Sequence, residues 1–342
     1  MLTTAFALVE WCGMVASLVE NGQRQFGRFT ATPLANPFDE FRGLRRVYEG
    51  FRTKEWAGFT LIHPEVAGSM IIQDAKYMAT GELYLYDRGS AAMSDYIANR
   101  LLPYGGLPAN LLQNRCTYAA GGLRLGYDFG ADEVLISIDI DGASSNPPVK
   151  ARLTLDVRRA SPPLVVSALL PGGKMYTNKI IYPASGTIVW GERRYEFDPA
   201  RDFAILDEHK SHLPYHTDWD WGTFAMPVDG HIVGANLANR PEEPGQQEES
   251  CIWTPDAALE LSDITFTQTG DDDAPWKMVS ADGRVDVTFT PQGHKGQTLN
   301  LGVVAMDYAQ WFGHYNGTIG DGKQVWPVEN VPGVCERMHA RF

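Results

Sequence analysis

The densest group of residues that could perform chemistry lies between Asp207 and Trp221. This stretch holds three of the eight histidines, four acidic residues, one lysine and two tryptophans. An imidazole exchanges protons near neutral pH, and a desolvated carboxyl group keeps a proton there because burial raises its pKa. We therefore expect acid–base chemistry here, with Asp207 and His209 as candidate catalytic residues.

The second half of this stretch has the alternation of a β-strand. On a strand, Thr217, Trp219, Trp221 and Thr223 would share one face, and His216, Asp218 and Asp220 the other. Two indoles on one face suit the wall of a lipophilic or π-rich pocket, where they could also stabilise a carbocation. The alternative is that both indoles are ordinary barrel core and that the two aspartates form a solvated face.

Before this strand, His209 and Lys210 could be a loop-borne acid or base and a holder of an anion or carbonyl group, or simply a polar surface turn. A zinc site from His209, His212 and His216 is a further alternative. Its spacing suits a helix, whereas Pro214 and the tryptophan alternation favour loop and strand, so we expect no metal.

Strand signals dominate the rest of the chain, as short segments rich in β-branched and aromatic residues and separated by Gly, Pro, Asn and Asp. With 34 Gly and 21 Pro for turns, this pattern predicts β-sandwiches or β-barrels. No glycine-rich phosphate loop is present. The predicted strands are Met70–Gln73, Glu82–Tyr86, Leu123–Phe129, Val134–Ile140, Lys150–Val157, Thr187–Trp190, Thr217–Met226, His231–Leu237, Arg284–Thr290 and Leu299–Met306.

Helices are expected to be few and short. Asp198 as cap and Pro199 at the first position predict a helix over Ala200–Leu206. The apolar run Met1–Val19 is interrupted by Glu10 and lacks a basic start, so it predicts an amphipathic lead-in rather than a signal peptide or membrane span. Turn signals place a domain boundary near residue 180, giving domains of 1–180 and 181–342.

Charge and cysteine usage restrict the partners. The net charge of −13 argues against nucleic acid, and also against tight binding to anionic lipid, since no run of Lys and Arg offers a local exception. Cys12, Cys116, Cys251 and Cys335 lie far apart, which predicts reduced and mostly buried thiols and a cytoplasmic protein. An extracytoplasmic disulfide and a nucleophilic cysteine are the alternatives.

Several motifs, in order along most of the chain, resemble an uncharacterised bacterial family. That family belongs to the lipocalin-like group that also holds carotenoid 1,2-hydratase, or hydroxyneurosporene synthase, and kievitone hydratase. The residues that carry the resemblance are Lys54-Glu55-Trp56, Leu83-Tyr84-Leu85-Tyr86-Asp87, Tyr176-Thr177-Asn178-Lys179, Leu206-Asp207, Pro214, Thr217-x-Trp219-x-Trp221, Gly234-x-Asn236-Leu237, Glu249, Phe312-Gly313-x-Tyr315-x-Gly317 and Gly333-Val334-Cys335-Glu336.

This resemblance implies an all-β chain of two consecutive lipocalin-like β-barrels with a hydrophobic cavity and no organic cofactor. Positions 208, 209 and 212 vary in the family pattern, so the resemblance gives His209 and His212 no role. Carried over by position, the site residues are Lys179, Asp207, Lys210, Trp219, Trp221, Asn236, Glu249 and Glu336. Tyr176, Tyr215, His216 and His314 complete the expected ligand-binding residues.

The function expected first is a cofactor-independent hydratase, dehydratase or isomerase of a lipophilic unsaturated small molecule. Asp207 and Glu249 would be the proton donors, with Lys179 and Lys210 orienting the substrate. The alternatives are a carrier or sensor of a hydrophobic molecule and, third, a glycan-processing enzyme. An acid and a base in one pocket without mutual salt bridges would favour the enzyme. The sequence leaves the oligomeric state open.

Overall fold

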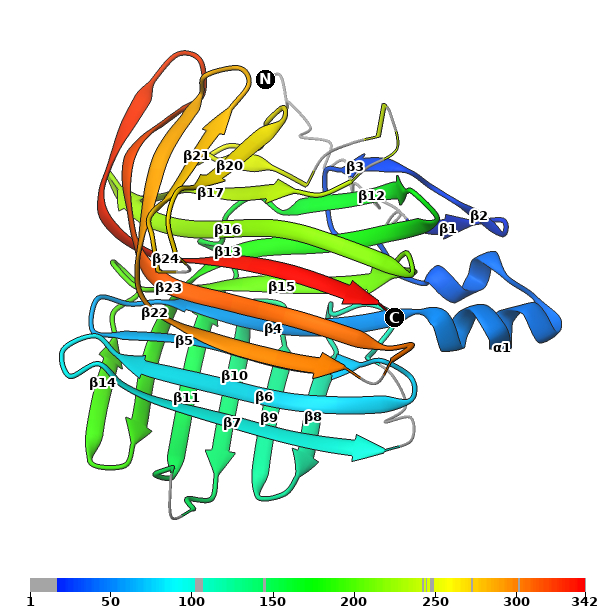
Figure 1. Cartoon of the computed structure of the whole chain (residues 1–342), viewed down its shortest axis with the longest axis horizontal. Helices are drawn as coiled ribbons and strands as arrows, with labels where there is room; N and C mark the ends of the chain where they lie inside the picture. Colours follow the sequence, from blue (N-terminus) through cyan, green and yellow to red (C-terminus); the bar gives the residue numbers. More distant parts are fainter. Residues whose placement is uncertain are drawn as a thin grey trace, which may run out of the picture.

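Strands form nearly all of the regular structure in the computed structural model (Figure 1). The structure describes residues 17–101, 107–143, 146–241, 243, 245–246, 249–271, 273–300 and 302–341. Within them lie one 3-10 helix, η1 (Pro37–Glu40), and one α-helix, α1 (Gly43–Arg52). Strands β1 (Val19–Glu20) and β2 (Gln23–Arg24) form a small separate sheet.

The first large sheet is a nearly closed barrel. Its main path runs in the order β7-β6-β5-β4-β15-β13-β11-β10-β9-β8, with β3, β12 and β14 attached beside it. The bounds are β3 (Gly27–Phe29), β4 (Lys54–Ile62), β5 (Val66–Asp74), β6 (Met78–Asp87), β7 (Ala92–Leu101), β8 (Arg115–Ala120), β9 (Leu123–Phe129), β10 (Glu133–Ile140), β11 (Val149–Asp156), β12 (Leu164–Leu170), β13 (Gly173–Trp190), β14 (Arg193–Phe197) and β15 (Phe203–Ser211).

The second large sheet is a half-barrel in the order β19-β18-β17-β16-β24-β23-β22-β21-β20. Its bounds are β16 (His216–Val228), β17 (His231–Asn239), β18 (Cys251–Trp253), β19 (Ala258–Glu260), β20 (Ile264–Gln268), β21 (Trp276–Ser280), β22 (Val285–Asn300), β23 (Ala305–Gly320) and β24 (Val325–Arg341). The prediction of an all-β chain with two barrel-like domains is thus confirmed.

Two local predictions are wrong. Asp198 and Pro199 start a tight turn, in which the Asp198 carbonyl accepts the amides of Arg201 and Asp202, and the chain then enters β15. Phe203 to Leu206 are buried side by side, which suits a strand covered on both faces rather than an amphipathic helix. The predicted strand Leu299–Met306 instead spans the turn between β22 and β23.

Strands β4, β13 and β15 are covered on both faces and therefore connect the two sheets. Phe59 and Leu206 face the core of the first barrel, whereas Ile181 and Ile205 pack with Ala225 and Trp253 of the second sheet. Because β15 lies between β4 and β13, its outward side chains meet the second sheet directly.

A second contact between the sheets is aromatic. Phe312 of β23 is fully buried, with ring centroids 4.3 Å from Tyr86 and 5.7 Å from Tyr84 of β6. Trp221 and Val334 belong to the same cluster. This cluster holds the half-barrel against the barrel beside the pocket described below.

Other expectations concern the ends and the thiols. The predicted lead-in over residues 1–19 lies almost entirely outside the described residues. Residue 180 falls within β13 of the first sheet, and the chain leaves the first sheet and enters the second at residues 212–215. The division into domains stays a prediction. Cys116, Cys251 and Cys335 are buried free thiols. In the described part of the chain, no helix has the length and apolar character needed to span a bilayer.

Replacing Phe312 by alanine should lower the free energy of unfolding by about 3–5 kcal/mol, because a fully buried ring is lost from the contact between the sheets. Urea unfolding of both proteins measures this change. Phe51→Ala is the matched control: its ring is exposed on α1, so the change should stay within about 0.5 kcal/mol. Equal effects would contradict the proposed contact.

Candidate functional site

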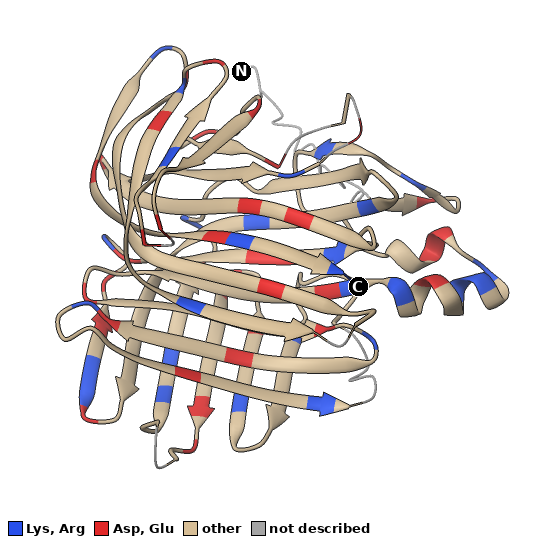
Figure 2. Ribbon diagram, viewed as in Figure 1, with Lys and Arg blue, Asp and Glu red and all other residues tan. Residues whose placement is uncertain are grey.

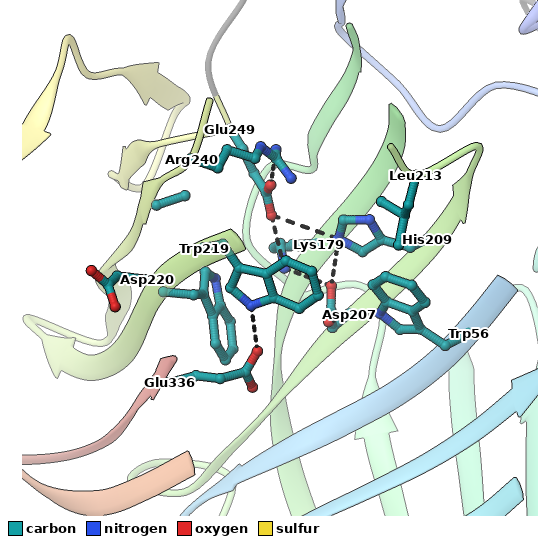
Figure 3. A pocket seen from close by; sticks show the side chains of 12 residues that line it. Trp56, Lys179, Asp207, His209, Leu213, Trp219, Asp220, Arg240, Glu249 and Glu336 are labelled. Carbon is teal, nitrogen blue, oxygen red and sulfur yellow. Dashed lines mark hydrogen bonds and ion pairs between the residues drawn. The ribbon is translucent and has the colours of Figure 1, made fainter. Parts of the chain in front are cut away.

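A small pocket lined by charged and aromatic side chains lies where the two sheets face each other (Figure 3). Its cavity has a volume of about 40 Å³, set in a wider concavity of about 440 Å³. The first sheet and the turn after it contribute Trp56, Lys179, Asp207, His209 and Leu213. The second sheet and the segment after β17 contribute Trp219, Asp220, Trp221, Ala238, Arg240, Glu249 and Glu336.

Strand alternation aims the polar groups of the first sheet into this pocket. On β15, Asp207 and His209 point out of the barrel, and the register places them opposite Lys179 on β13 and Trp56 on β4. Figure 3 shows these side chains converging from neighbouring strands. The unforeseen strand β15 therefore brings together residues that the sequence placed on a loop.

The centre of the pocket is a cluster of ion pairs. Lys179 Nζ lies 2.5 Å from Asp207 Oδ1 and 3.0 Å from Glu249 Oε1. His209 Nε2 lies 3.3 Å and 3.7 Å from the same two oxygens. Arg240 pairs with the other oxygen of Glu249, and Trp56 Nε1 donates to Asp207 Oδ2 over 3.1 Å. Lys179, Asp207 and Glu249 thus join the two sheets electrostatically.

These contacts fix the charge of both carboxylates. Burial alone would raise the pKa of Asp207, but Lys179 and His209 outweigh it and hold that pKa well below its usual range. The pKa of Glu249 is likewise lowered despite burial, chiefly by Arg240 and Lys179. Lys179 keeps a raised pKa because its two carboxylate partners outweigh its desolvation. Both acids are therefore ionised at neutral pH, which argues against them as resting proton donors.

Glu336 is a buried carboxyl of a different kind. It accepts hydrogen bonds from Trp219 Nε1 at 2.7 Å, Tyr308 OH at 2.9 Å and Gln310 Nε2 at 2.8 Å. All three donors are uncharged. Burial raises the pKa of Glu336, and the negative charge of Asp207 adds to the rise, while the hydrogen bonds oppose it. Glu336 is consequently the pocket carboxyl best suited to hold a proton.

The two predicted indoles line the same pocket in different ways. Lys179 Nζ lies 4.6 Å from the ring centroid of Trp221, a cation–π contact. Trp221 Nε1 donates to Asn236 Oδ1, and Asn236 in turn donates to the backbone oxygen of Glu249. Asn236 therefore supports the pocket from behind, whereas Trp219 holds Glu336 (Figure 3).

The remaining predicted ligand-binding residues do not line this pocket. Lys210 points into the first barrel, bound to Glu55 Oε1 and the Pro108 carbonyl, because it alternates with His209 on β15. Tyr176 is buried in an apolar cluster with Leu18 and Val165. Tyr215 and His216 are exposed at the turn into β16, and His314 lies on β23, where burial and Arg88 lower its pKa to about 4.

The three histidines of the zinc alternative have separate surroundings. His209 stacks on Trp56 at 4.4 Å, His212 binds the Glu49 carbonyl and contacts Phe41, and His216 contacts Tyr215. Across the described residues, no group of three or more His, Cys, Asp or Glu is arranged to hold a metal ion.

Sequence reasoning missed Trp56 and Arg240 as pocket residues, and Tyr308 and Gln310 as partners of Glu336. Trp56 stands in one of the motifs that carry the family resemblance, which was the available signal. The other three lie far from residues 207–221 in the sequence, and only strand pairing brings them to the pocket.

Comparison with protein families gives one match, the family described as "Domain of unknown function (DUF2804)", over residues 38–342. The chain belongs to this family. Among curated proteins, no sequence matches this DUF2804 member significantly.

Solved structures show the fold that this DUF2804 chain shares. The crystal structure of CghA has a TM-score of 0.56 and 10% identity, over 96% of this chain and 97% of that one. CghA with Sch210972 has a TM-score of 0.55 and 10% identity, over 85% and 88%. Kievitone hydratase from Nectria haematococca has 10% identity and a TM-score of 0.48, over 84% and 88%. At such identity the likeness concerns the fold alone.

Removing the positive charge of Lys179 should destabilise the protein strongly. Lys179→Met leaves two buried carboxylates without their shared cation, which costs about 3–5 kcal/mol at pH 7 in urea unfolding. The exposed pair of Lys277 and Asp286 provides the control, because Lys277→Met should change stability by less than about 1 kcal/mol.

The pH dependence of this difference has a defined sign. Depressed folded pKa values stabilise the protein above the unfolded values near about 4, and this contribution is lost as pH falls through the folded values. Without Lys179 both carboxylates should protonate at higher pH. The gap between wild type and Lys179→Met should therefore shrink as pH falls through the variant's higher carboxylate pKa values, and a gap independent of pH would contradict the ionised cluster.

Proposed function

We propose that this pocket is the active site of a cofactor-independent hydratase, dehydratase or isomerase of a lipophilic unsaturated small molecule. The observation that carries the proposal is the pairing of Glu336, whose pKa is raised, with the ionised Asp207 in one pocket. Carboxyl groups whose pKa values are pushed apart by their environments can divide the roles of acid and base.

In the proposed hydration, Glu336 gives its proton to one alkene carbon, and the positive charge develops on the other. The faces of Trp219 and Trp221 and the carboxylate of Asp207 stabilise that charge. The oxygen of a water molecule bonds to the cationic carbon, and the resulting oxonium loses its extra proton to Asp207. Dehydration is the same sequence reversed, and isomerisation loses a carbon-bound proton instead of gaining water.

The roles of the other groups follow from their contacts. Lys179 and His209 hold Asp207 in place and keep it ionised, and Arg240 does the same for Glu249. Asp207 retains 25% exposure of its side chain, so it is the more accessible of the two carboxylates, whereas Glu249 retains 3%. Because Asp207 and Glu249 are both ionised, we assign the proton donor to Glu336.

The comparisons support a small organic ligand. One CghA crystal structure pairs a protein of this fold with Sch210972, and the sequence motifs of the DUF2804 chain resemble the lipocalin-like hydratase group. A ligand of ordinary size occupies several hundred Å³, far more than the cavity of about 40 Å³. Substrate binding therefore requires side chains at the mouth of the pocket to move.

A carrier or sensor without turnover is the second candidate. The ion pairs among Lys179, Asp207, Arg240 and Glu249 favour it, because these groups satisfy one another as structural charges would. Glu336 favours the enzyme, since it is buried and the three side chains that donate hydrogen bonds to it are uncharged.

Glu336→Gln should lower turnover about 10²–10⁴-fold while ligand affinity is nearly kept. The amide fills the same space but has no acidic proton to give. Lipophilic unsaturated compounds are first screened for binding, and bound compounds are then incubated in heavy-oxygen water. Mass spectrometry detects gain or loss of water. Glu329→Gln, an exposed glutamate of the same strand, should leave turnover unchanged.

The pH profile provides a further check on this assignment. A proton donor with a raised pKa works below that pKa, so kcat/KM of the wild type should fall as pH rises through it. Full activity of Glu336→Gln would place the donor elsewhere. Binding without any turnover or deuterium exchange, in the wild type, would favour the carrier.

A further inference from the structure

Helix α1 leaves its large apolar side chains largely exposed, and within the described residues only the Phe51 ring lies near another ring, that of Tyr77 at 6.4 Å. Leu44, Val47, Tyr48 and Phe51 are 89%, 72%, 63% and 57% exposed. Their spacing of three and four residues places them on one face of the helix. Leaving four neighbouring apolar side chains in water costs free energy, and exposed apolar patches of this kind mark interaction sites.

The opposite face of α1 is the one that contacts the protein. The backbone oxygen of Glu49 binds His212 Nε2, and Gly50 lies against Phe38, where an added Cβ would meet the ring at 3.6 Å. The helix is therefore docked through its polar and small residues. This orientation is the reverse of an ordinary surface helix, whose apolar side faces the core.

Basic residues surround the exposed face. Residues 42–54 hold five basic residues and one acidic residue, Glu49, for a local net charge of +4 in a chain of net charge −13. Arg45 and Arg52 lie along one side of the apolar stripe and both reach Glu49, while Arg46 pairs with Asp39 of η1. Figure 2 shows the arginines of α1 with an acidic residue among them and acidic residues on the neighbouring η1.

The same end of the molecule exposes further apolar groups. Strand directions place α1, which leads into β4, beside the turn from β15 to β16 and the turn from β22 to β23. Tyr215 and Val303 are exposed in these two turns, joined by a hydrogen bond from Tyr215 OH to the Val303 carbonyl. Exposed apolar groups at this end of the molecule are therefore not confined to the helix.

We propose that α1 is a membrane-surface helix, which lays Leu44, Val47, Tyr48 and Phe51 into the interface of an anionic lipid bilayer while its arginines meet the headgroups. An exposed apolar stripe flanked by Arg is the pattern of helices that lie in a membrane interface. A second copy is disfavoured because a symmetric contact would bring two patches of +4 together. Residues 1–16 carry one charged side chain, Glu10, so this segment has little negative charge to pair with the arginines of α1.

This proposal is independent of the proposed function, since vesicle binding requires no turnover. The probe is the full chain mixed with vesicles of phosphatidylcholine containing about a third phosphatidylserine, or with phosphatidylcholine alone, and separated by flotation. We expect binding to the anionic vesicles, weakened by salt because exposed charges are screened.

Val47→Asp should weaken vesicle binding about tenfold or more. Val325→Asp is its matched control: Val325 is 67% exposed and begins β24 at the other end of the sheets. Arg45→Glu should weaken binding about 25-fold, because it changes the charge by two units at roughly fivefold per unit. Arg158→Glu, at an arginine of similar exposure that is also paired with one acid, should leave binding unchanged.

Three results would overturn the proposal. Wild-type binding no stronger to anionic than to neutral vesicles would exclude recognition by charge. A change from dimer to monomer caused by Val47→Asp alone, without lipid, would assign the face to a second copy. A lower melting temperature for Val47→Asp but not for Val325→Asp would mean that the chain's own residues cover the apolar face of α1.

Discussion

The ammonium group of Lys179 lies between two carboxylates from different halves of the protein, Asp207 on β15 of the barrel and Glu249 in the segment between β17 and β18 of the half-barrel. Desolvating three charges costs several kcal/mol for each ion unless the geometry compensates it. That requirement restricts how the two sheets can face each other. The position of Lys179 against the ring of Trp221 on the second sheet depends on this arrangement, whereas Trp56 stacks on His209 within the first sheet.

The same interaction separates the chemistry of the pocket carboxyls. Asp207 and Glu249 have cations beside them and stay ionised, while Glu336 has uncharged donors and feels the negative charge of Asp207. An acid and a base can therefore coexist in one small cavity. The aromatic cluster around Phe312 includes Trp221, which lines that cavity, and packs β23 and β24 against β6.

Sequence reasoning succeeded where a single element decided the outcome. Alternation alone predicted that Trp219 and Trp221 share one face of β16, and both line the pocket. It failed at Asp198–Leu206, where a capping signature competes with a strand buried on both faces. It also gave no helix at Gly43–Arg52, where Arg45, Arg46 and Arg52 come together only once the helix is wound. The partners of Glu336 depend on long-range strand pairing, which no local pattern encodes.

The ion cluster divides into two pairs along the chain. Lys179 and Asp207 both belong to the first sheet, and Arg240 and Glu249 both follow β17 of the second. Each half of the protein therefore contributes a cation and an anion to the cluster, and neither half holds an unpaired charge of the cluster before the sheets meet. Within this cluster, therefore, the first barrel can form with Lys179 and Asp207 already paired, and a chain still being synthesised need not wait for its second half to neutralise them.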